Sequence, residues 1–241
     1  MEEIEEKYRK IADRAYREFT DVADYIWKSP RLIEHETKLE VQKLKNYFPN
    51  SEEHAKLRWH FESNKLNSVF PYLIAVGNTF SIMSLFESYL LIVAIELEKD
   101  TGIRTTSVSG SGINRIFNYF RSVGIDLEAI EPFHQIMAAI KIRNCLSHAS
   151  GMLSWSKEEA ELKRIQRSGM YLSKDHRVLR KKNGRDFDEV RITNSGFGER
   201  IQVDNIYAFV LASYLRDYLI GVCQSAALLN GESDFATFRV N

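Results

Sequence analysis

The stretch 71-PYLIAVGNTFSIMSLFESYLLIVAIELEKDT-101 decides the fold class of this chain. Apolar side chains recur in it every three or four residues, which is the period of an α-helix: Val76, Phe80, Met83, Leu90, Val93 and Leu97. Glu87 lies on the same face, and Asn78, Ser81 and Ser84 also interrupt the apolar run. Polar and charged groups inside a membrane are costly, so we expect a buried helix of a soluble protein without a membrane partner.

The composition of the whole chain also favours helices. Its 241 residues include only 12 Gly and 4 Pro, fewer chain breakers than an all-β fold is expected to carry. The 33 basic and 33 acidic residues cancel, so a nucleic-acid site would have to be a local patch. Two cysteines exclude a disulfide framework and a four-cysteine zinc site, and they fit a cytoplasmic protein.

Residues 1–70 are expected to form an N-terminal helical extension. The charged segment 2–29 carries one narrow apolar stripe, and Pro30 ends or restarts this helix. A second charged helix is predicted from about Leu32 to Tyr47, and a third begins after the turn 49–51. The stripe predicts packing on the body or on a second subunit.

Residues 71–241 are expected to form a helical domain. A helix that begins near Asp126 or Pro132 should end at Ser147 or His148, before Gly151 at a usual helix C-cap position. Beyond it, short apolar runs are broken by Asn183-Gly184 and by Gly196-Phe197-Gly198. Asn-Gly between apolar runs signals a hairpin turn, so a small β-hairpin or meander is expected around 175–203, before the last helix. The predicted fold class is therefore mainly α.

The polar end of the helix before Gly151 is the main candidate for chemistry, with the sequence Arg143-Asn144-Cys145-Leu146-Ser147-His148. The helical period that places Ile140 on the apolar stripe leads next onto Arg143, Asn144, Ser147 and His148. Buried polar groups are costly unless each finds a partner, so this placement needs an explanation. The simplest one is a helix C-terminus whose basic residues offset the helix dipole.

A second explanation is catalysis on RNA. An imidazole transfers protons near neutral pH, and a guanidinium binds phosphate oxygens through a fixed fork of donors. Together they suffice for transesterification of RNA: a base removes the 2′-hydroxyl proton, and a cation stabilises the phosphate transition state. Asn144 and His148 are four residues apart and share a helix face, while Arg143 and His148 are roughly 140° apart around the axis.

The segment resembles the signature of the HEPN (higher eukaryotes and prokaryotes nucleotide-binding) superfamily, in which an Arg and a polar residue precede a His. Here four residues separate Arg143 from His148, and Asn144 holds the polar position. The resemblance implies a HEPN-like bundle of about four helices over 71–230. It also implies metal-independent endoribonucleases that act as two-fold homodimers with a composite active site, in toxin–antitoxin systems, phage defence and RNA processing.

Roles follow from the matched motif. Arg143 would contact the scissile phosphate, His148 would be the general base or acid, and Asn144 would orient the site, with Ser147 as a supporting candidate. HEPN toxins that are silenced by a nucleotidyltransferase carry a Tyr two residues after the His, and Ser150 stands there in this chain. That mode of silencing is not supported, while another antitoxin or regulatory protein stays open as a partner.

Glu87 is a singular charge within an apolar helix. It is a candidate to pair with Arg143 or to orient His148. The alternatives are a structural ion pair, for example with Arg216, and an edge position open to solvent.

A basic cluster surrounds the predicted hairpin turn, and a weak RNA-binding role is assigned to it: Arg177, Arg180, Lys181, Lys182 and Arg185. A solvated turn is the alternative for the same residues. The other histidines form no ligand cluster at a recognisable spacing, so neither a metal nor a cofactor is predicted.

Two functions remain open from the sequence, and a third interpretation is a helical scaffold whose motif is accidental. The first is a homodimeric, metal-independent endoribonuclease in prokaryotic phage defence or a toxin–antitoxin system. The second is a non-catalytic HEPN-like module that binds RNA, a nucleotide or a protein, suggested by the long charged N-terminal helices.

Overall fold

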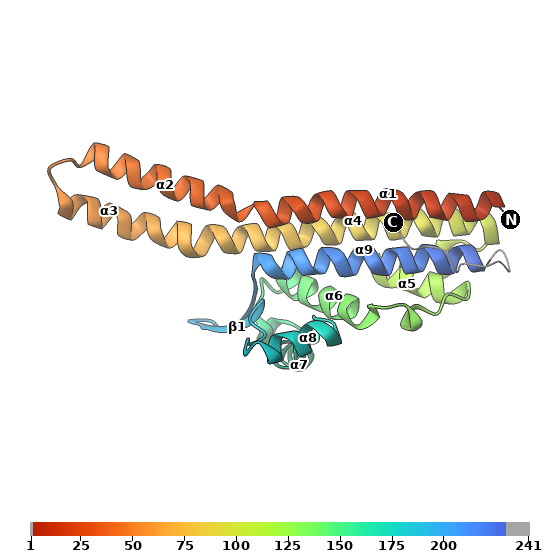
Figure 1. Ribbon diagram of the computed structural model, residues 1–241. Helices are drawn as coiled ribbons and strands as arrows, with labels where there is room; N and C mark the ends of the chain where they lie inside the picture. Colours follow the sequence, from red (N-terminus) through yellow and green to blue (C-terminus); the bar gives the residue numbers. More distant parts are fainter. Residues whose placement is uncertain (1, 230–241) are drawn as a thin grey trace.

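Three long helices, α1 (Glu2–Lys28), α4 (Phe70–Thr101) and α9 (Asn205–Leu228), lie side by side in the computed structural model (Figure 1). The structure describes residues 2–229. Its other elements are the helices α2 (Pro30–Tyr47), α3 (Glu52–Asn64), α5 (Gly112–Ser122), α6 (Phe133–His148), α7 (Glu159–Ser168) and α8 (Lys174–Lys182), and the strands β1 (Val190–Ser195) and β2 (Gly198–Val203). The predicted mainly α fold with a β-hairpin before the last helix is confirmed.

The apolar periodicity of α4 explains why it is central to the core. Leu90, Val93 and Leu97 are fully buried between neighbouring helices, as that spacing requires. The stripe of α1 packs on this same chain: Tyr8, Ala15 and Phe19 are buried. Helix α1 therefore belongs to the packed body.

Helices α2 and α3 form an antiparallel two-helix projection, called the arm below, that extends away from the body (Figure 1). Only Leu44 is buried in α2, and no residue of α3 is. Helix α3 passes through a π-helical turn (Lys65–Val69) into α4. The expected boundary between the N-terminal extension and the helical domain, after residue 70, therefore falls inside one continuous helical run.

A buried polar joint fixes the base of the arm. Asn78 on α4 donates to Ser29 Oγ at 3.1 Å and to Asn205 Oδ1 at 2.7 Å. Asn205 in turn donates to the Ile26 carbonyl at 2.6 Å. The joint ties together α1, α4 and α9 where the chain leaves the body, and it explains why α4 carries a polar residue at position 78.

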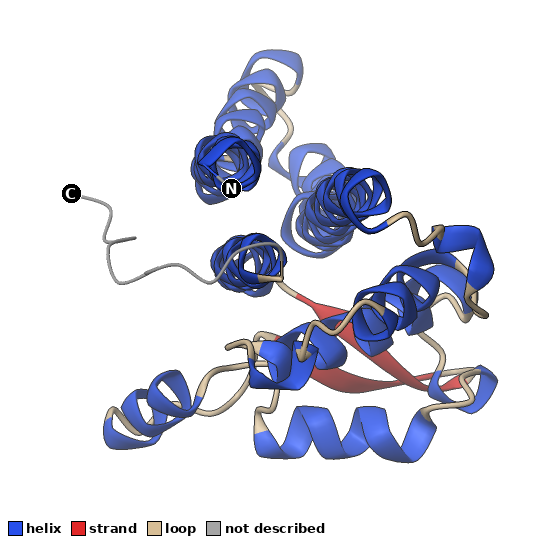
Figure 2. Ribbon diagram, turned by 90° about the vertical axis from the view of Figure 1, so that its right-hand side faces the viewer, coloured by secondary structure: helices blue, strands red, loops and turns tan. Residues whose placement is uncertain are grey.

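The remaining elements form a second layer. Helices α5 and α6 lie beside α9 on the side away from α1, and the two strands with α7 and α8 lie beyond them (Figures 1 and 2). The strands pair antiparallel, with Val190 opposite Val203 and Ser195 opposite Gly198. This hairpin delivers the chain to α9, whose N-cap Asp204 accepts a hydrogen bond from the Tyr207 amide at 2.9 Å.

The position of the hairpin turn is a correction to the sequence analysis. Asn183-Gly184 does not join two strands; it ends helix α8, and Gly184 has a φ of 63°. The turn is instead Gly196-Phe197, in the second of the two breaks that the sequence contains, between β1 and β2. The Asn-Gly signal was misleading because both dipeptide positions tolerate a left-handed backbone, which helix ends need as much as hairpin turns do.

Two helical runs are long and apolar enough to cross a membrane by length and composition: Glu52–Thr101 and α9. Core helices of soluble proteins pass the same test. More than half of the most apolar stretch of α9 is buried inside this fold.

Candidate active site

The end of α6 is built by a switch from apolar to polar residues. Ile136, Ala139 and Ile140 are buried, and the helix then continues through Arg143 to His148, its last residue. The amides of Ala149 and Gly151 both donate to the Cys145 carbonyl at 3.0 Å, which closes the helix end. The predicted helix and its end before Gly151 match the observed ones.

The backbone after the helix is left-handed at two consecutive residues, with φ of 50° at Ser150 and 79° at Gly151. A Cβ at Gly151 would lie 2.8 Å from the Ile201 carbonyl oxygen, so glycine is required there. The Ile201 amide donates to the Gly151 carbonyl at 2.8 Å. Strand β2 therefore holds the loop that follows His148.

Arg143 is paired with Glu87 of α4 by an ion pair and hydrogen bond, and not with the backbone of its own helix. Arg143 Nη1 also donates to Asn144 Oδ1 at 3.1 Å. The two charged side chains keep 23% and 29% of their exposed surface, so the pair is open to solvent on one side. Glu87 thus contacts Arg143, whereas Arg216 bonds to its neighbour Asp217.

His148 and Ser147 are exposed at the helix end. Within residues 2–229, neither side chain makes a hydrogen bond or an ion pair, so the imidazole is available to solvent or to a ligand. The helix thus presents an anchored arginine and an exposed histidine.

Cys145, inside the motif, has no nucleophilic role in this geometry. Its side chain is buried, and Sγ lies 3.9 Å from the Met152 carbonyl oxygen. Burial raises the pKa of the Cys145 thiol, which keeps it protonated at neutral pH.

The sequence analysis missed a second cation beside the motif. Arg200 on β2 donates from Nε to the Ser150 carbonyl at 3.0 Å and from Nη2 to the Tyr72 hydroxyl at 3.1 Å. Its guanidinium also lies 5.2 Å from the centre of the Tyr72 ring. Arg200 is 50 residues from Ser150 along the chain, and no local pattern predicts the contact.

The basic cluster predicted near a hairpin turn lies on and after α8. Arg180 is paired with Glu189, which is 1% exposed, so this arginine serves the fold. Among the described residues, no hydrogen bond or ion pair joins the cluster to the end of α6: Arg177, Arg180, Lys181, Lys182 and Arg185.

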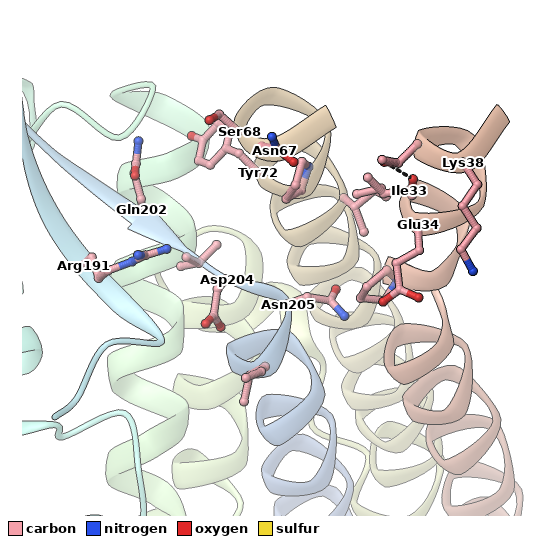
Figure 3. Close-up of a pocket in the computed structure, with 16 residues that line it drawn as sticks. Ile33, Glu34, Lys38, Asn67, Ser68, Tyr72, Arg191, Gln202, Asp204 and Asn205 are labelled. Atoms are coloured by element: carbon pink, nitrogen blue, oxygen red, sulfur yellow. Dashed lines mark hydrogen bonds between the residues drawn. The ribbon is translucent and has the colours of Figure 1, made fainter. Parts of the chain in front are cut away.

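A cleft of about 970 Å³ lies between the base of the arm, the β-hairpin and the start of α9 (Figure 3). Its polar lining includes Glu34 and Lys38 on α2, Asn67, Ser68 and Tyr72 on the run into α4, Arg191 and Gln202 on the strands, and Asp204 and Asn205 at the start of α9. Tyr72 is shared between this cleft and Arg200. We call it the arm–hairpin cleft.

The described residues contain no group of three or more His, Cys, Asp or Glu side chains placed to hold a metal ion. No protein-family model matches this chain, and no curated protein or solved structure matches it either.

Proposed function

We propose that this protein is a metal-independent endoribonuclease that acts as a homodimer, with a composite active site at the ends of the two α6 helices. One observation carries the proposal: Arg143 is anchored by Glu87, while His148, five residues later, is exposed and unpaired among residues 2–229. An oriented guanidinium and an accessible imidazole are the groups that this reaction needs.

The reaction follows from the two side chains. The imidazole of His148 takes the proton from a ribose 2′-hydroxyl, and the resulting oxygen attacks the adjacent phosphorus. The P–O5′ bond breaks, the leaving oxygen takes up a proton from a protonated imidazole or from water, and Arg143 stabilises the phosphate oxygens. The products are a 2′,3′-cyclic phosphate and a 5′-hydroxyl.

An exposed apolar face next to the site supports the dimer. Leu91 and Ile95 follow Glu87 by four and eight residues on α4 and are 46% and 42% exposed. Ile92 beside them is 39% exposed. A contiguous apolar face of this kind is typically covered by a partner, and a two-fold contact along it would bring two Arg143–Glu87 pairs together.

The biological setting that we propose is prokaryotic phage defence or a toxin–antitoxin system in the cytoplasm. It rests on the resemblance of the motif to HEPN ribonucleases. In such a setting an antitoxin or regulatory protein would keep the site inactive until it is needed.

A non-catalytic module that binds RNA, a nucleotide or a protein is the second candidate. The arm favours it, because Tyr47, Leu57 and Phe61 expose 75%, 59% and 59% of their surface on helices that bury little else. Such a surface suits a protein partner.

Cleavage of end-labelled RNA by purified protein in the presence of EDTA separates the two candidates. We expect the wild-type protein to cut, and Arg143→Ala and His148→Ala to lose cleavage by about 10²–10⁴-fold. His134→Ala is the matched control, because His134 is an exposed histidine on the same helix. A wild-type protein that does not cut, or equal cutting by all variants, contradicts the endoribonuclease.

The composite site has its own test. Leu91→Asp together with Ile95→Asp places charges on the apolar face, and we expect the dimer to dissociate and cleavage to be lost. The oligomeric state is measured by light scattering in solution. Full activity of a monomeric variant would exclude a site shared between two copies.

A further inference from the structure

Arg200 differs from Arg143 and Arg180 in the groups to which its guanidinium is bonded. Those two are paired with glutamates, whereas Arg200 is held by a carbonyl, a hydroxyl and an aromatic ring. Among residues 2–229 no carboxylate forms an ion pair with Arg200. Its positive charge is therefore not offset by a bonded partner, and its position is fixed by neutral groups. A fixed and uncompensated guanidinium favours the binding of an anion.

The loop after His148 fixes Arg200 beside the motif. Ser150, which accepts from Arg200 Nε, is two residues after His148. Its left-handed backbone turns the chain at that point, and Ser150 is the one non-glycine residue with positive φ in the described part of the chain. Strain of this kind concentrates at functional sites. The side chain of Arg200 also packs on Gly151, where a Cβ would lie 3.2 Å from Arg200 Nε.

Tyr72 connects Arg200 to the arm–hairpin cleft. Its hydroxyl accepts from Arg200, and its side chain lines the cleft (Figure 3). The cleft offers the amides of Asn67 and Gln202, the hydroxyl of Ser68 and the ring of Tyr72. The carboxylates of Glu34 and Asp204 also line it, together with the basic Lys38 and Arg191. Amides pair with base edges and aromatic rings stack on bases, while the volume of about 970 Å³ is at the upper end of small-ligand sites.

We propose that Arg200 and the arm–hairpin cleft form a subsite for single-stranded RNA: Arg200 binds a phosphate next to the scissile one, and the cleft receives the attached base. This inference rests on the proposed endoribonuclease. It extends that site from the end of α6 to the base of the arm. It also gives the β-hairpin a function, since β2 supplies both Arg200 and Gln202.

The test measures RNA binding and does not depend on cleavage. In the His148→Ala background, a fluorescein-labelled single-stranded RNA is titrated by anisotropy at several salt concentrations. Arg200→Gln should weaken binding by about tenfold, as expected for the loss of a hydrogen-bonded ion contact. It should also reduce the salt dependence by about 0.7 in log–log slope, the value for one phosphate contact on a single strand.

Arg17→Gln is the matched control. Arg17 is an exposed arginine on α1 that donates to a backbone carbonyl, and α1 lies on the far side of α9 from the hairpin (Figure 1). Equal affinities and equal salt slopes for the two arginine variants would overturn the inference. Gln202→Ala should weaken binding without a change in salt slope, because an amide carries no charge.

Two further measurements keep the test independent of folding and of the proposed function. Tyr72→Phe removes the hydroxyl that holds Arg200 but keeps the ring, so it should weaken binding by less than Arg200→Gln at an unchanged melting temperature. Single-stranded DNA and duplex RNA of the same sequence should bind more weakly, and equal binding of either would overturn the assignment to single-stranded RNA. If the wild-type protein binds RNA as expected but does not cut it, the proposed nuclease activity is contradicted and the RNA subsite is not.

Discussion

Two arginine–glutamate pairs in this molecule have the same chemistry and different surroundings. Arg180 on α8 meets Glu189 before β1, where the glutamate is 1% exposed and also accepts from the Tyr171 hydroxyl at 2.9 Å. Arg143 on α6 meets Glu87 on α4, where both side chains remain about a quarter exposed. Only the glutamate of the first pair is enclosed by protein, since Arg180 keeps 21% of its side-chain surface; in the second pair both groups border solvent, next to an exposed His148. The two are called the enclosed pair and the open pair below.

The difference is what we expect between a pair with a structural role and a pair with the proposed catalytic role. In the enclosed pair, removal of the glutamate leaves the buried Tyr171 hydroxyl without its acceptor and the partly buried Arg180 without its counter-charge. In the open pair, water screens the charges, so the contribution to stability is small. In the open pair, Arg143 bonds to Asn144 and Glu87 through Nη1 and Nη2 and keeps 23% of its side-chain surface, so a phosphate can reach the guanidinium from solvent. Measurements that separate stability from RNA chemistry therefore test the comparison.

The largest effect is expected for the enclosed pair. Glu189→Ala removes the counter-charge of Arg180 and the acceptor of the Tyr171 hydroxyl. We expect a loss of about 3 kcal/mol in the free energy of unfolding, measured by urea denaturation. Glu199→Ala is the control, because its pair with Lys163 is on the surface, and it should cost less than about 1 kcal/mol. A similar small cost for both variants would remove the distinction between the pairs.

For the open pair we expect a small effect on stability and a large effect on RNA cleavage. Glu87→Gln should change the free energy of unfolding by less than about 1 kcal/mol. Cleavage of RNA should nevertheless fall about tenfold, since Arg143 loses the group that orients it. Glu158→Gln is the control: Glu158, just before α7, pairs with Lys141 of α6, and the substitution should leave both quantities unchanged. Unchanged cleavage by Glu87→Gln would show that Glu87 does not orient Arg143 for cleavage.

The smallest effect concerns Asp204, a partly buried carboxylate without an ion pair among the described residues. Burial raises the pKa of Asp204, so the folded protein holds this proton more tightly than the unfolded chain does. Stability from this group is thus present at low pH and is lost as the pH rises through the raised pKa. Asp204→Asn keeps the cap and does not titrate.

The melting temperature of Asp204→Asn minus that of the wild type should therefore increase between pH 4 and 7. The subtraction removes the contribution of carboxylates whose pKa is lowered by basic partners, such as Glu128 beside Arg121. A difference that stays constant over this range would show that the cap hydrogen bond offsets the cost of burial.

Much of the fold follows from periodicity. The apolar stripes of α1, α4, α6 and α9 predict buried helices, because apolar residues three and four positions apart form one buried face whatever element packs against it. Helix α8 did not follow from it: its Val178 and Leu179 are exposed, so they carry no periodic signal, and Asn183-Gly184 fits a hairpin as well as a helix end.

Some residues of the candidate site could be predicted from the sequence, and others could not. Arg143, Asn144 and His148 form a local pattern on one helix, which sequence spacing can show. Glu87 was a candidate partner because a charge within an apolar stripe stands out. Arg200 and Tyr72 come from segments 128 residues apart and meet only through the fold, so spacing along the chain could not identify them.

The unbroken helical run from Glu52 to Thr101 has a mechanical consequence. It begins at the tip of the arm and carries Glu87 in its second half, roughly 50 Å further along at a rise of about 1.5 Å per residue. No loop lies between the two to absorb a displacement. A displacement of the tip, for example by a bound partner, would therefore move Glu87 relative to Arg143, with the helix turning about the hydrogen-bonded Asn78.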